Sequence, residues 1–335
     1  MRRILVIGAL GQIGSELTPA LRERYGAARV VASDLQIAPS RLSRAGCAYE
    51  QLDCTQPRQM VDIMRRHDIG VIYHLAALLS VVAEKRPRDA WDINMGGVHN
   101  LLETARLFRC QVFFPSSIAA FGPSTPRIST PQVTIQRPTT IYGVTKAAGE
   151  LLCDYYASRF GVDVRGLRLP GLVSCIASPG GGTTDYAVEM FRQASLGKNY
   201  ACFLAADTRL DMMYMPDAIR AMIELMEADA TRLRYRNAYN VTAMSITPAE
   251  LAAEIRKHIP GFHVDYQVDP MRQSIADSWP QSLDATVARE DWGFSPRFNL
   301  AAMTADMLAR LRAAEGARKA DSPESEELYA NSRTD

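Results

Sequence analysis

The run Ile4-Leu5-Val6-Ile7-Gly8-Ala9-Leu10-Gly11-Gln12-Ile13-Gly14 decides the fold of this 335-residue chain. Its four consecutive apolar residues, 4–7, are typical of a strand that is buried on both faces of a parallel sheet. Glycines follow at positions 8, 11 and 14, and residues 15–24 then have the pattern of a helix. A second apolar strand, 29–33, leads into Asp34. This order of strand, glycine turn, helix and strand predicts the first unit of a doubly wound α/β fold.

The glycine turn also predicts a ligand. Glycines let the backbone turn tightly and approach a pyrophosphate, whose charge then lies at the N-terminus of the following helix. Asp34 lies twenty residues after Gly14, where a carboxylate accepts the hydroxyls of an adenosine ribose and repels a 2′-phosphate. The stretch therefore favours a site for NAD over NADP. An ordinary tight turn is the alternative, but the order of the elements favours the cofactor site.

The alternation of strand and helix continues through the first half of the chain. The expected strands are 47–53, 70–74, 111–116 and 162–168, and the expected helices are 57–67, 89–109 and 140–160. Such repetition predicts a Rossmann fold, in which NAD(P) binds at the carboxyl ends of a parallel sheet covered by helices. We expect a dinucleotide-binding domain at 1–168, with parts of 211–245 returning to it.

Several residues at the strand ends are candidates for the site. Asp53 either reaches the adenine amino group or caps the next helix. The stretch Leu75-Ala76-Ala77 has small side chains that leave room for a cofactor, although they also suit tight packing. Asn94 interrupts an apolar helix, so we expect it to satisfy backbone groups near the site. His74 ends an apolar run, and we interpret it as structural.

Tyr142 and Lys146 are the candidates for chemistry. They are four residues apart in the expected helix 140–160 and therefore lie on one face of it. The pKa of a free tyrosine is ~10, and a nearby cation in a water-poor cleft is expected to lower it, so that Tyr142 becomes a base. The plainer interpretation is a tyrosine at a helix start and a solvated lysine. Ser117, at the end of the fifth strand, is either a catalytic hydroxyl or an ordinary turn residue.

Composition excludes several classes of protein. Hydrophobic residues make up 47% of the chain and charged residues 22%, and the net charge is +1, which is typical of a soluble globular enzyme without a nucleic-acid or membrane surface. The chain enters a strand directly after Met1-Arg2, so we expect a cytoplasmic protein. Its six cysteines are dispersed without a C-x-x-C pair; we therefore expect neither a metal site nor disulfides.

The regular alternation of strand and helix ends at Leu169, where the second half of the chain begins. A long glycine-rich loop follows, and it ends in Gly182-Thr183-Thr184-Asp185 before the expected helix 186–196. Hydroxyls and free N–H groups at a helix N-terminus suit a small carboxylate, although these residues can also serve simply as caps. Trp279 lies in a Ser- and Pro-containing loop and is expected to form a pocket wall. We expect a smaller α/β substrate lobe at 169–312 and a flexible tail at 313–335.

Taken together, these motifs resemble the extended short-chain dehydrogenase/reductase superfamily, which includes the nucleotide-sugar epimerases. The matching residues are Gly8, Gly11, Gly14, Asp34, Asp53, Leu75-Ala76-Ala77, Ser116-Ser117, Phe121-Gly122, Tyr142 and Lys146. The resemblance implies that Ser117 positions the substrate oxygen and that Tyr142 is the acid/base. It implies that Lys146 holds the nicotinamide ribose and lowers the pKa of the tyrosine.

Later stretches are similar to the short-chain, epimerase-like L-threonine 3-dehydrogenases over roughly residues 1 to 310. They are 179–186, 212–217, 275–280 and 288–293. This resemblance implies NAD-dependent oxidation of L-threonine to 2-amino-3-oxobutanoate without a metal. The implied cofactor residues are Gly8, Gly11, Gln12, Ile13, Gly14, Asp34, Asp53, Cys54, Leu75, Ala76, Ala77, Asn94, Tyr142, Lys146 and Leu169. The implied substrate residues are Ser80, Ser117, Tyr142, Gly182, Thr183, Thr184, Asp185 and Trp279.

The resemblance also implies partners. Helices on either side of the fifth strand often pair two subunits in the superfamily, so a homodimer is expected. The product is a β-keto acid, which implies a second enzyme, a ligase, that consumes it. Two positions depart from the pattern: Asp211 stands where a proline is usual, and Asp284-Ala285 where two acids are usual.

Two other functions stay open. One is a nucleotide-sugar epimerase or dehydratase, although dehydratases of that group have an acid beside the active serine and this chain has Ile118. The other is a non-catalytic NAD-sensing module; such proteins commonly lose the tyrosine or the lysine, and both are present here.

Overall fold

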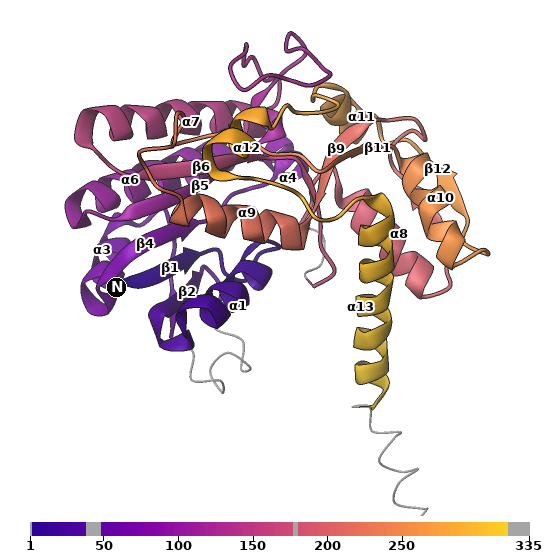
Figure 1. Cartoon of the computed structure of the whole chain (residues 1–335), viewed down its shortest axis with the longest axis horizontal. Helices are drawn as coiled ribbons and strands as arrows, with labels where there is room; N and C mark the ends of the chain where they lie inside the picture. Colours follow the sequence, from indigo (N-terminus) through magenta and orange to yellow (C-terminus); the bar gives the residue numbers. More distant parts are fainter. Residues whose placement is uncertain (1, 38–47, 177–179, 321–335) are drawn as a thin grey trace, which may run out of the picture.

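The centre of the molecule is a seven-stranded parallel sheet (Figure 1). The structure is a computed structural model that describes residues 2–37, 48–176 and 180–320, with the side chains described as far as residue 316. Along the sheet the strands are β10 (Tyr239–Asn240), β6 (Val164–Leu169), β5 (Gln111–Ser117), β4 (Ile69–His74), β1 (Arg3–Ile7), β2 (Val30–Asp34) and β3 (Tyr49–Gln51). All neighbouring pairs are parallel. The Rossmann-type α/β prediction is therefore confirmed.

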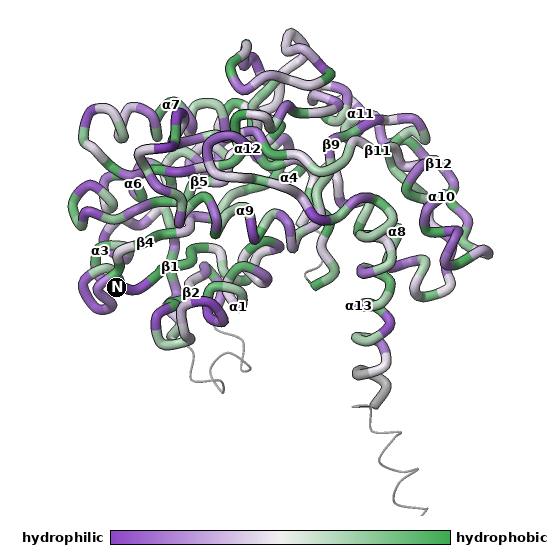
Figure 2. The backbone as a smooth tube through the Cα atoms, in the orientation of Figure 1, coloured by the Kyte–Doolittle hydropathy of each residue, from purple (hydrophilic) through white to green (hydrophobic). Residues whose placement is uncertain are grey.

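Helices cover both faces of this sheet. On one face lie α3 (Pro57–His67), α6 (Gly97–Phe108) and α7 (Ile141–Phe160), and on the other α1 (Gly14–Tyr25), α9 (Met215–Glu227) and α12 (Thr286–Trp292). Figure 2 shows apolar residues along β1 and β4, which are buried between the two layers. Strand order reverses between β1 and β4, and a crevice for a ligand opens at such a point, outside the carboxyl ends of the strands.

The expected single helix 89–109 is divided into three parts. The structure has α5 (Pro87–Trp91), a π-helical turn η2 (Asp92–Gly96) and then α6. A π turn holds one more residue than an α turn and commonly lies at a functional site. Here it contains Asn94, whose amide bonds to groups outside the helix. The need to place this side chain explains why the helix is irregular there.

The second half of the chain forms smaller sheets around a core of its own. Strands β7 (Gly171–Val173), β9 (Leu210–Tyr214) and β11 (Met244–Ile246) form one sheet, and β8 (Tyr200–Cys202) pairs with β12 (Val264–Tyr266). The helices here are α8 (Asp185–Ser195), α10 (Pro248–His258), α11 (Pro270–Asp277) and α13 (Leu300–Ala320). Since α13 reaches Ala320, the first eight residues of the expected tail are helical; residues 321–335 lie outside the described chain.

No helix among the described residues is both long and apolar enough to cross a membrane. No three His, Cys, Asp or Glu side chains in this part of the chain lie close enough together to hold a metal ion.

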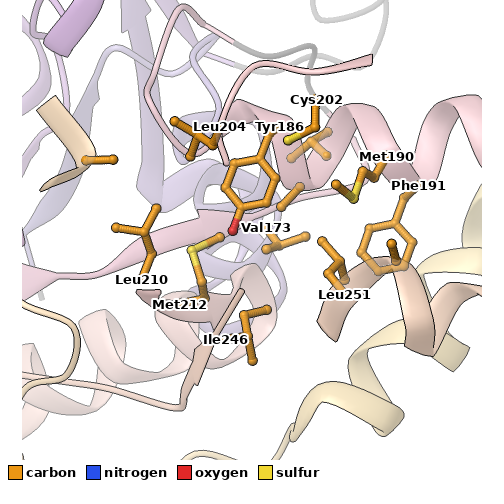
Figure 3. Packing of buried hydrophobic residues seen from close by; sticks show 14 of the residues in the cluster. Val173, Tyr186, Met190, Phe191, Cys202, Leu204, Leu210, Met212, Ile246 and Leu251 are labelled. Carbon is orange, nitrogen blue, oxygen red and sulfur yellow. The ribbon is translucent and has the colours of Figure 1, made fainter. Parts of the chain in front are cut away.

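The core of the second half contains a phenol without a hydrogen bond. Tyr186, on α8, is fully buried, and its hydroxyl has no partner among the described residues. Figure 3 shows the phenol oxygen among apolar side chains that include Val173 and Met212. A buried polar group that loses its water and gains no bond destabilises the fold.

Tyr186→Phe is therefore expected to increase the free energy of unfolding by about 1 kcal/mol, because it removes an unsatisfied hydroxyl and keeps the ring. Urea denaturation measures the change. Tyr214→Phe is the matched control: the Tyr214 hydroxyl donates to Asp306 at 2.7 Å, so its loss should reduce stability. A Tyr186→Phe protein less stable than the wild type would contradict this account of the core.

Candidate active site

The first turn of α7 is fixed by hydrogen bonds at its N-terminus. Thr140 caps the helix, its Oγ1 accepting the amide of Gly143 at 3.0 Å. Glu84, on the short helix α4 (Ser80–Lys85), accepts the amide of Ile141 at 2.7 Å. Capping and a negative charge both stabilise a helix N-terminus. Tyr142 is therefore presented from a well-anchored turn.

Gly143 lets that turn approach the end of β5. A Cβ placed on it would lie 2.2 Å from the carbonyl oxygen of Ala119 and 2.7 Å from Pro138, closer than a side chain can pack. Ala119 belongs to η3 (Ile118–Ala120), the 3-10 turn that follows Ser117. A side chain at position 143 would push Tyr142 away from Ser117.

Ser117 and Tyr142 interact directly. The Ser117 oxygen accepts the amide of Ala119 at 3.2 Å, and the Ser117 and Tyr142 side chains line the same cleft. Hydrogen bonding by Ser117 favours the phenolate and lowers the pKa of Tyr142, but desolvation by the surrounding protein is the larger effect and raises this pKa to about 12. Without ligands, the tyrosine is therefore a neutral phenol at physiological pH.

Lys146 lies behind the tyrosine, in the interior. Its Nζ donates to the Pro115 carbonyl at 2.6 Å and lies 5.5 Å from the centre of the Tyr142 ring and 5.0 Å from that of Phe114. Burial lowers its pKa to about 8, against the opposing effects of Cys153 and Glu150.

The predicted lowering of the Tyr142 pKa is not found in the ligand-free protein. We expected the cation to lower the pKa of Tyr142, but that pKa is raised. The physical reason is that burial disfavours the charged form of both groups. The ammonium also donates its hydrogen bond to the Pro115 carbonyl rather than to the phenol.

Asn94 ties the loop after β4 to α7. Its Oδ1 accepts the amide of Leu78 at 2.8 Å, and its Nδ2 donates to the Leu78 carbonyl at 3.2 Å and to Thr145 Oγ1 at 3.1 Å. The expectation that Asn94 satisfies backbone groups near the site is confirmed. His74 is buried nearby, and burial, with the charge of Lys146, lowers its pKa to about 3. It stays neutral and is unsuited to acid/base chemistry at physiological pH.

The glycine-rich loop closes the cleft on the side of the second half of the chain. It differs from the expected loop in the hydrogen bonding of its amides. The Thr183 and Ser80 hydroxyl oxygens lie 3.0 Å apart. The amides of Gly181 and Gly182, expected to be free, both donate to Asp185 Oδ2, at 2.8 and 2.7 Å. A carboxylate from α8 therefore already occupies the position where an anion was expected. Residues 177–179 of this loop lie outside the described chain.

Most of the predicted site residues line one cleft of about 120 Å³. They are Gln12, Ile13, Leu75, Ala77, Ser80, Ser117, Tyr142, Lys146, Leu169, Gly182, Thr183, Thr184, Asp185 and Trp279. The sequence analysis missed Leu79, Pro115, Ser116, Ile118, Pro170, Gly171 and Leu172. All of these lie within three positions of a predicted residue, so their closeness in sequence was the available signal.

The other predicted residues lie outside this cleft. Ala76 and Asn94 line a small adjoining cavity with Lys146. Asp34 Oδ2 accepts the amide of Leu10 at 3.0 Å, and Asp53 accepts the amide and hydroxyl of Thr55 at 2.9 and 2.7 Å. Asp53 therefore stabilises the turn before α3 and does not cap that helix, whose N-terminus has no side-chain cap. Of the remaining residues, Gly8 and Gly11 lie in the turn after β1, Gly14 begins α1, and Cys54 follows β3.

The turn after β1 fits a pyrophosphate. Helix α1 has no side-chain cap at its N-terminus, so backbone N–H groups there are available to an anion. A Cβ on Gly14 would lie 2.2 Å from the Gly8 oxygen, and one on Gly8 would lie 2.8 Å from the Ala76 amide. The Nε2 of Gln12 is buried in the cleft without a hydrogen-bond partner among the described residues. A bound dinucleotide would give that amide a partner.

Comparison with known proteins identifies the family. Residues 4–242 match the NAD dependent epimerase/dehydratase family. The chain belongs to this family. NAD is accordingly its cofactor.

Three relatives narrow the comparison. An uncharacterized epimerase/dehydratase of Staphylococcus haemolyticus is 52% identical over 315 residues, which are 94% of this chain and 99% of the relative. The solved L-threonine dehydrogenase of Clostridium difficile is 51% identical with a TM-score of 0.91, covering 94% of this chain and 98% of that one. The holo form of the GalE-like L-threonine dehydrogenase of Cupriavidus necator is 51% identical with a TM-score of 0.90, covering 92% and 99%.

Gly14→Ala should weaken NAD binding by roughly a hundredfold, because the added Cβ displaces the turn that meets the pyrophosphate. Isothermal titration calorimetry measures the dissociation constant. Gly96→Ala is the control, since a Cβ there has open space within 4 Å and should leave binding unchanged. Equal affinity of the Gly14 variant and wild type would contradict the assignment of this turn to the cofactor.

Proposed function

We propose that this enzyme oxidises the 3-hydroxyl of L-threonine with NAD, giving L-2-amino-3-oxobutanoate and NADH. The single observation that carries the proposal is the Ser117–Tyr142 pair in a cleft closed by the hydroxyls of Ser80 and Thr183. Two of the solved structures compared above, both 51% identical over nearly the whole chain, are L-threonine dehydrogenases.

In the proposed reaction Tyr142 is the base. As phenolate it takes the proton of the substrate hydroxyl, while Ser117 donates a hydrogen bond to the same oxygen and orients it. The positive charge of Lys146, behind the tyrosine, favours the phenolate whenever the ammonium is protonated. The oxidised nicotinamide, when bound, accepts a hydride from the substrate carbon.

The amino-acid end of the substrate meets the glycine-rich loop. In this proposal the hydroxyls of Ser80, Thr183 and Thr184, rather than the Gly182 amide that Asp185 already engages, receive the carboxylate. Asp185 holds the loop in shape through the amides of Gly181 and Gly182. Trp279 is largely buried and lines the same cleft, so it excludes water from the reacting atoms, which strengthens every polar contact there.

The cofactor and the substrate are assigned to different halves of the chain. We propose that 1–168, with parts of 211–245, hold the cofactor and that 169–312 hold the substrate.

We also propose a homodimer through α6 and α7, supported by exposed Leu107 and Leu151 on these helices, which are 63% and 68% accessible. The β-keto acid product requires a second enzyme to consume it before it loses carbon dioxide.

An epimerase or dehydratase is the alternative that the relatives keep open, because one 52% identical relative carries that name. The position after the active serine argues against a dehydratase of the usual type, since Ile118 supplies no acid there. An epimerase returns its hydride to the product and leaves no NADH behind.

Addition of L-threonine to the enzyme with excess NAD should therefore produce NADH continuously, seen as nicotinamide fluorescence or absorbance. A panel of amino acids and amino alcohols measures the preference, and UDP-sugars test the alternative. Absence of NADH with L-threonine, together with turnover of a UDP-sugar, would replace this proposal with the epimerase. Tyr142→Phe is the control variant: it should lose turnover by about a thousandfold while the NAD dissociation constant stays nearly the same.

The rate should also depend on pH in a defined direction. The reactive state needs a phenolate at Tyr142 and an ammonium at Lys146, whose pKa values are about 12 and about 8 without ligands. The fraction in that state rises about tenfold per pH unit below pH 8 and then levels off as the lysine loses its proton. Initial rates at saturating NAD and low L-threonine measure kcat/KM. A flat profile between pH 6 and 8 would contradict the assignment of Tyr142 as base.

A further inference from the structure

Asp211 is a buried carboxylate outside the reaction described above. It lies in β9 with a 1% exposed side chain, opposite Ser245 of β11 in the antiparallel register. Its Oδ1 accepts the Thr242 hydroxyl at 2.5 Å, and its Oδ2 accepts the amide of Leu283 at 2.7 Å. The second bond links the sheet to a segment far away in sequence.

That segment, residues 279–284, begins at Trp279 and is here called the wall segment. It is held in place by three parts of the molecule. The loop 127–130 binds its backbone: the amides of Gln281 and Ser282 donate to the Arg127 carbonyl at 2.7 and 3.3 Å. The hydroxyl of Ser245 donates to the Gln281 carbonyl at 2.7 Å. Asp211 supplies the third attachment, through Leu283.

The sheet formed by β7, β9 and β11 therefore shapes the cleft in two ways. Strand β7, which pairs with β9, places Gly171 and Leu172 in the lining, and Asp211 holds the segment that places Trp279 there. Trp279 and Leu283 also pack in the core cluster that contains Leu210 and Met212. A shift of the wall segment relative to β9 would move the indole against the substrate.

We propose that Asp211 is a positioning residue for substrate binding, which fixes Trp279 in the cleft by anchoring the wall segment to β9, and that this anchor loosens as pH rises through the acid range. The substrate part of the proposal rests on the proposed function. The anchoring part stands on the hydrogen bonds alone.

The pH dependence follows from burial. Desolvation raises the pKa of Asp211 to about 7, although Thr242, Leu283 and Met212 donate hydrogen bonds that oppose the rise. When the wall segment opens, the carboxyl returns toward its ordinary pKa of ~3.9. With the wall segment in place, Asp211 therefore binds its proton more tightly than when the segment is open. Opening of the wall segment becomes easier as pH rises from about 4 to about 7, and the opening equilibrium no longer depends on pH above about 7.

The charged groups around the anchor have partners of their own. Arg209, two residues before Asp211, donates to the Ser245 carbonyl and pairs with Glu250 at 2.6 Å. Asp284, next to Leu283, accepts the amide of Thr286 at 2.8 Å, and its pKa is lowered, chiefly by the side-chain hydrogen bond from Thr286. The groups that bond directly to the Asp211 carboxylate are therefore hydroxyl and amide donors.

Amide hydrogen exchange of the full-length enzyme tests the anchor without substrate. After correction for intrinsic chemistry, exchange at Leu283 should rise about tenfold per pH unit between pH 5 and 6.5 in the wild type. In Asp211→Asn, which keeps an acceptor but cannot titrate, the rise should vanish. A wild type without this slope, or an Asn variant that retains it, would overturn the anchoring proposal.

Kinetics tests the substrate part. Asp211→Ala removes both bonds and should raise KM for L-threonine by about tenfold, with kcat and NAD affinity changed less than twofold. An unchanged KM in a folded Ala variant would overturn the positioning role. If the Ala variant does not fold, the KM of the Asn variant is measured across pH 5 to 7 instead. This KM should lose the pH dependence that the wild type shows. A wild type that produces no NADH from L-threonine refutes the proposed function, and the exchange slope still decides the anchor.

Asp217→Asn is the matched control. Asp217 is equally buried, and it accepts the amides of Arg297 and Phe298 and pairs with Arg220, away from the wall segment. Its replacement should reduce stability while leaving the Leu283 slope and KM unchanged. The same loss of slope in this control would show a general effect of destabilisation and would overturn the specific role of Asp211.

Discussion

The close approach of α7 to the turn after β5 is the constraint on which the site depends. Without a side chain at position 143, the first turn of α7 lies directly against Ala119. Because of this contact, a hydroxyl at the end of a strand and a phenol at the start of a helix line the same cleft. Their separation in sequence is twenty-five residues, so backbone packing, rather than local sequence, sets their geometry. Parallel sheets commonly build sites in this way, at the carboxyl ends of their strands.

Burial then determines the protonation states. A cation next to a phenol suggests a lowered tyrosine pKa, but desolvation acts on both groups and favours their neutral forms. The ligand-free site thus holds a protonated Tyr142 and a Lys146 close to the midpoint of its titration near pH 8. Polar groups that are already oriented reduce the free-energy cost of forming a phenolate beside an ammonium in this cleft, because these groups do not have to reorganise at the moment of reaction. Ser117 is such a group, because Ala119 fixes the direction of its hydroxyl.

The substrate side of the cleft is assembled from distant parts of the second half. The glycine-rich loop is shaped by Asp185 and contacts α4 through Thr183 and Ser80. The same short helix places Glu84 at the N-terminus of α7. The residues that face the proposed substrate and the turn that carries Tyr142 are therefore mechanically joined. Such a site keeps its geometry because its parts are fixed by hydrogen bonds to regular elements rather than by a loop alone.

The sequence by itself determined the Rossmann-type fold, the family, the cofactor and most of the cleft, because glycine spacing, strand hydrophobicity and the Tyr142–Lys146 interval are local patterns with direct geometric consequences. The protonation of Tyr142, the hydrogen bond from the Gly182 amide to Asp185 and the π turn at Asn94 became visible in the folded molecule alone. The fold also decided that Asp211, which in sequence was a minor departure from a pattern, bonds to Leu283. The physical reason is that pKa values and hydrogen-bond partners depend on desolvation and on atoms brought together from distant residues, and neither is encoded in the local order of side chains.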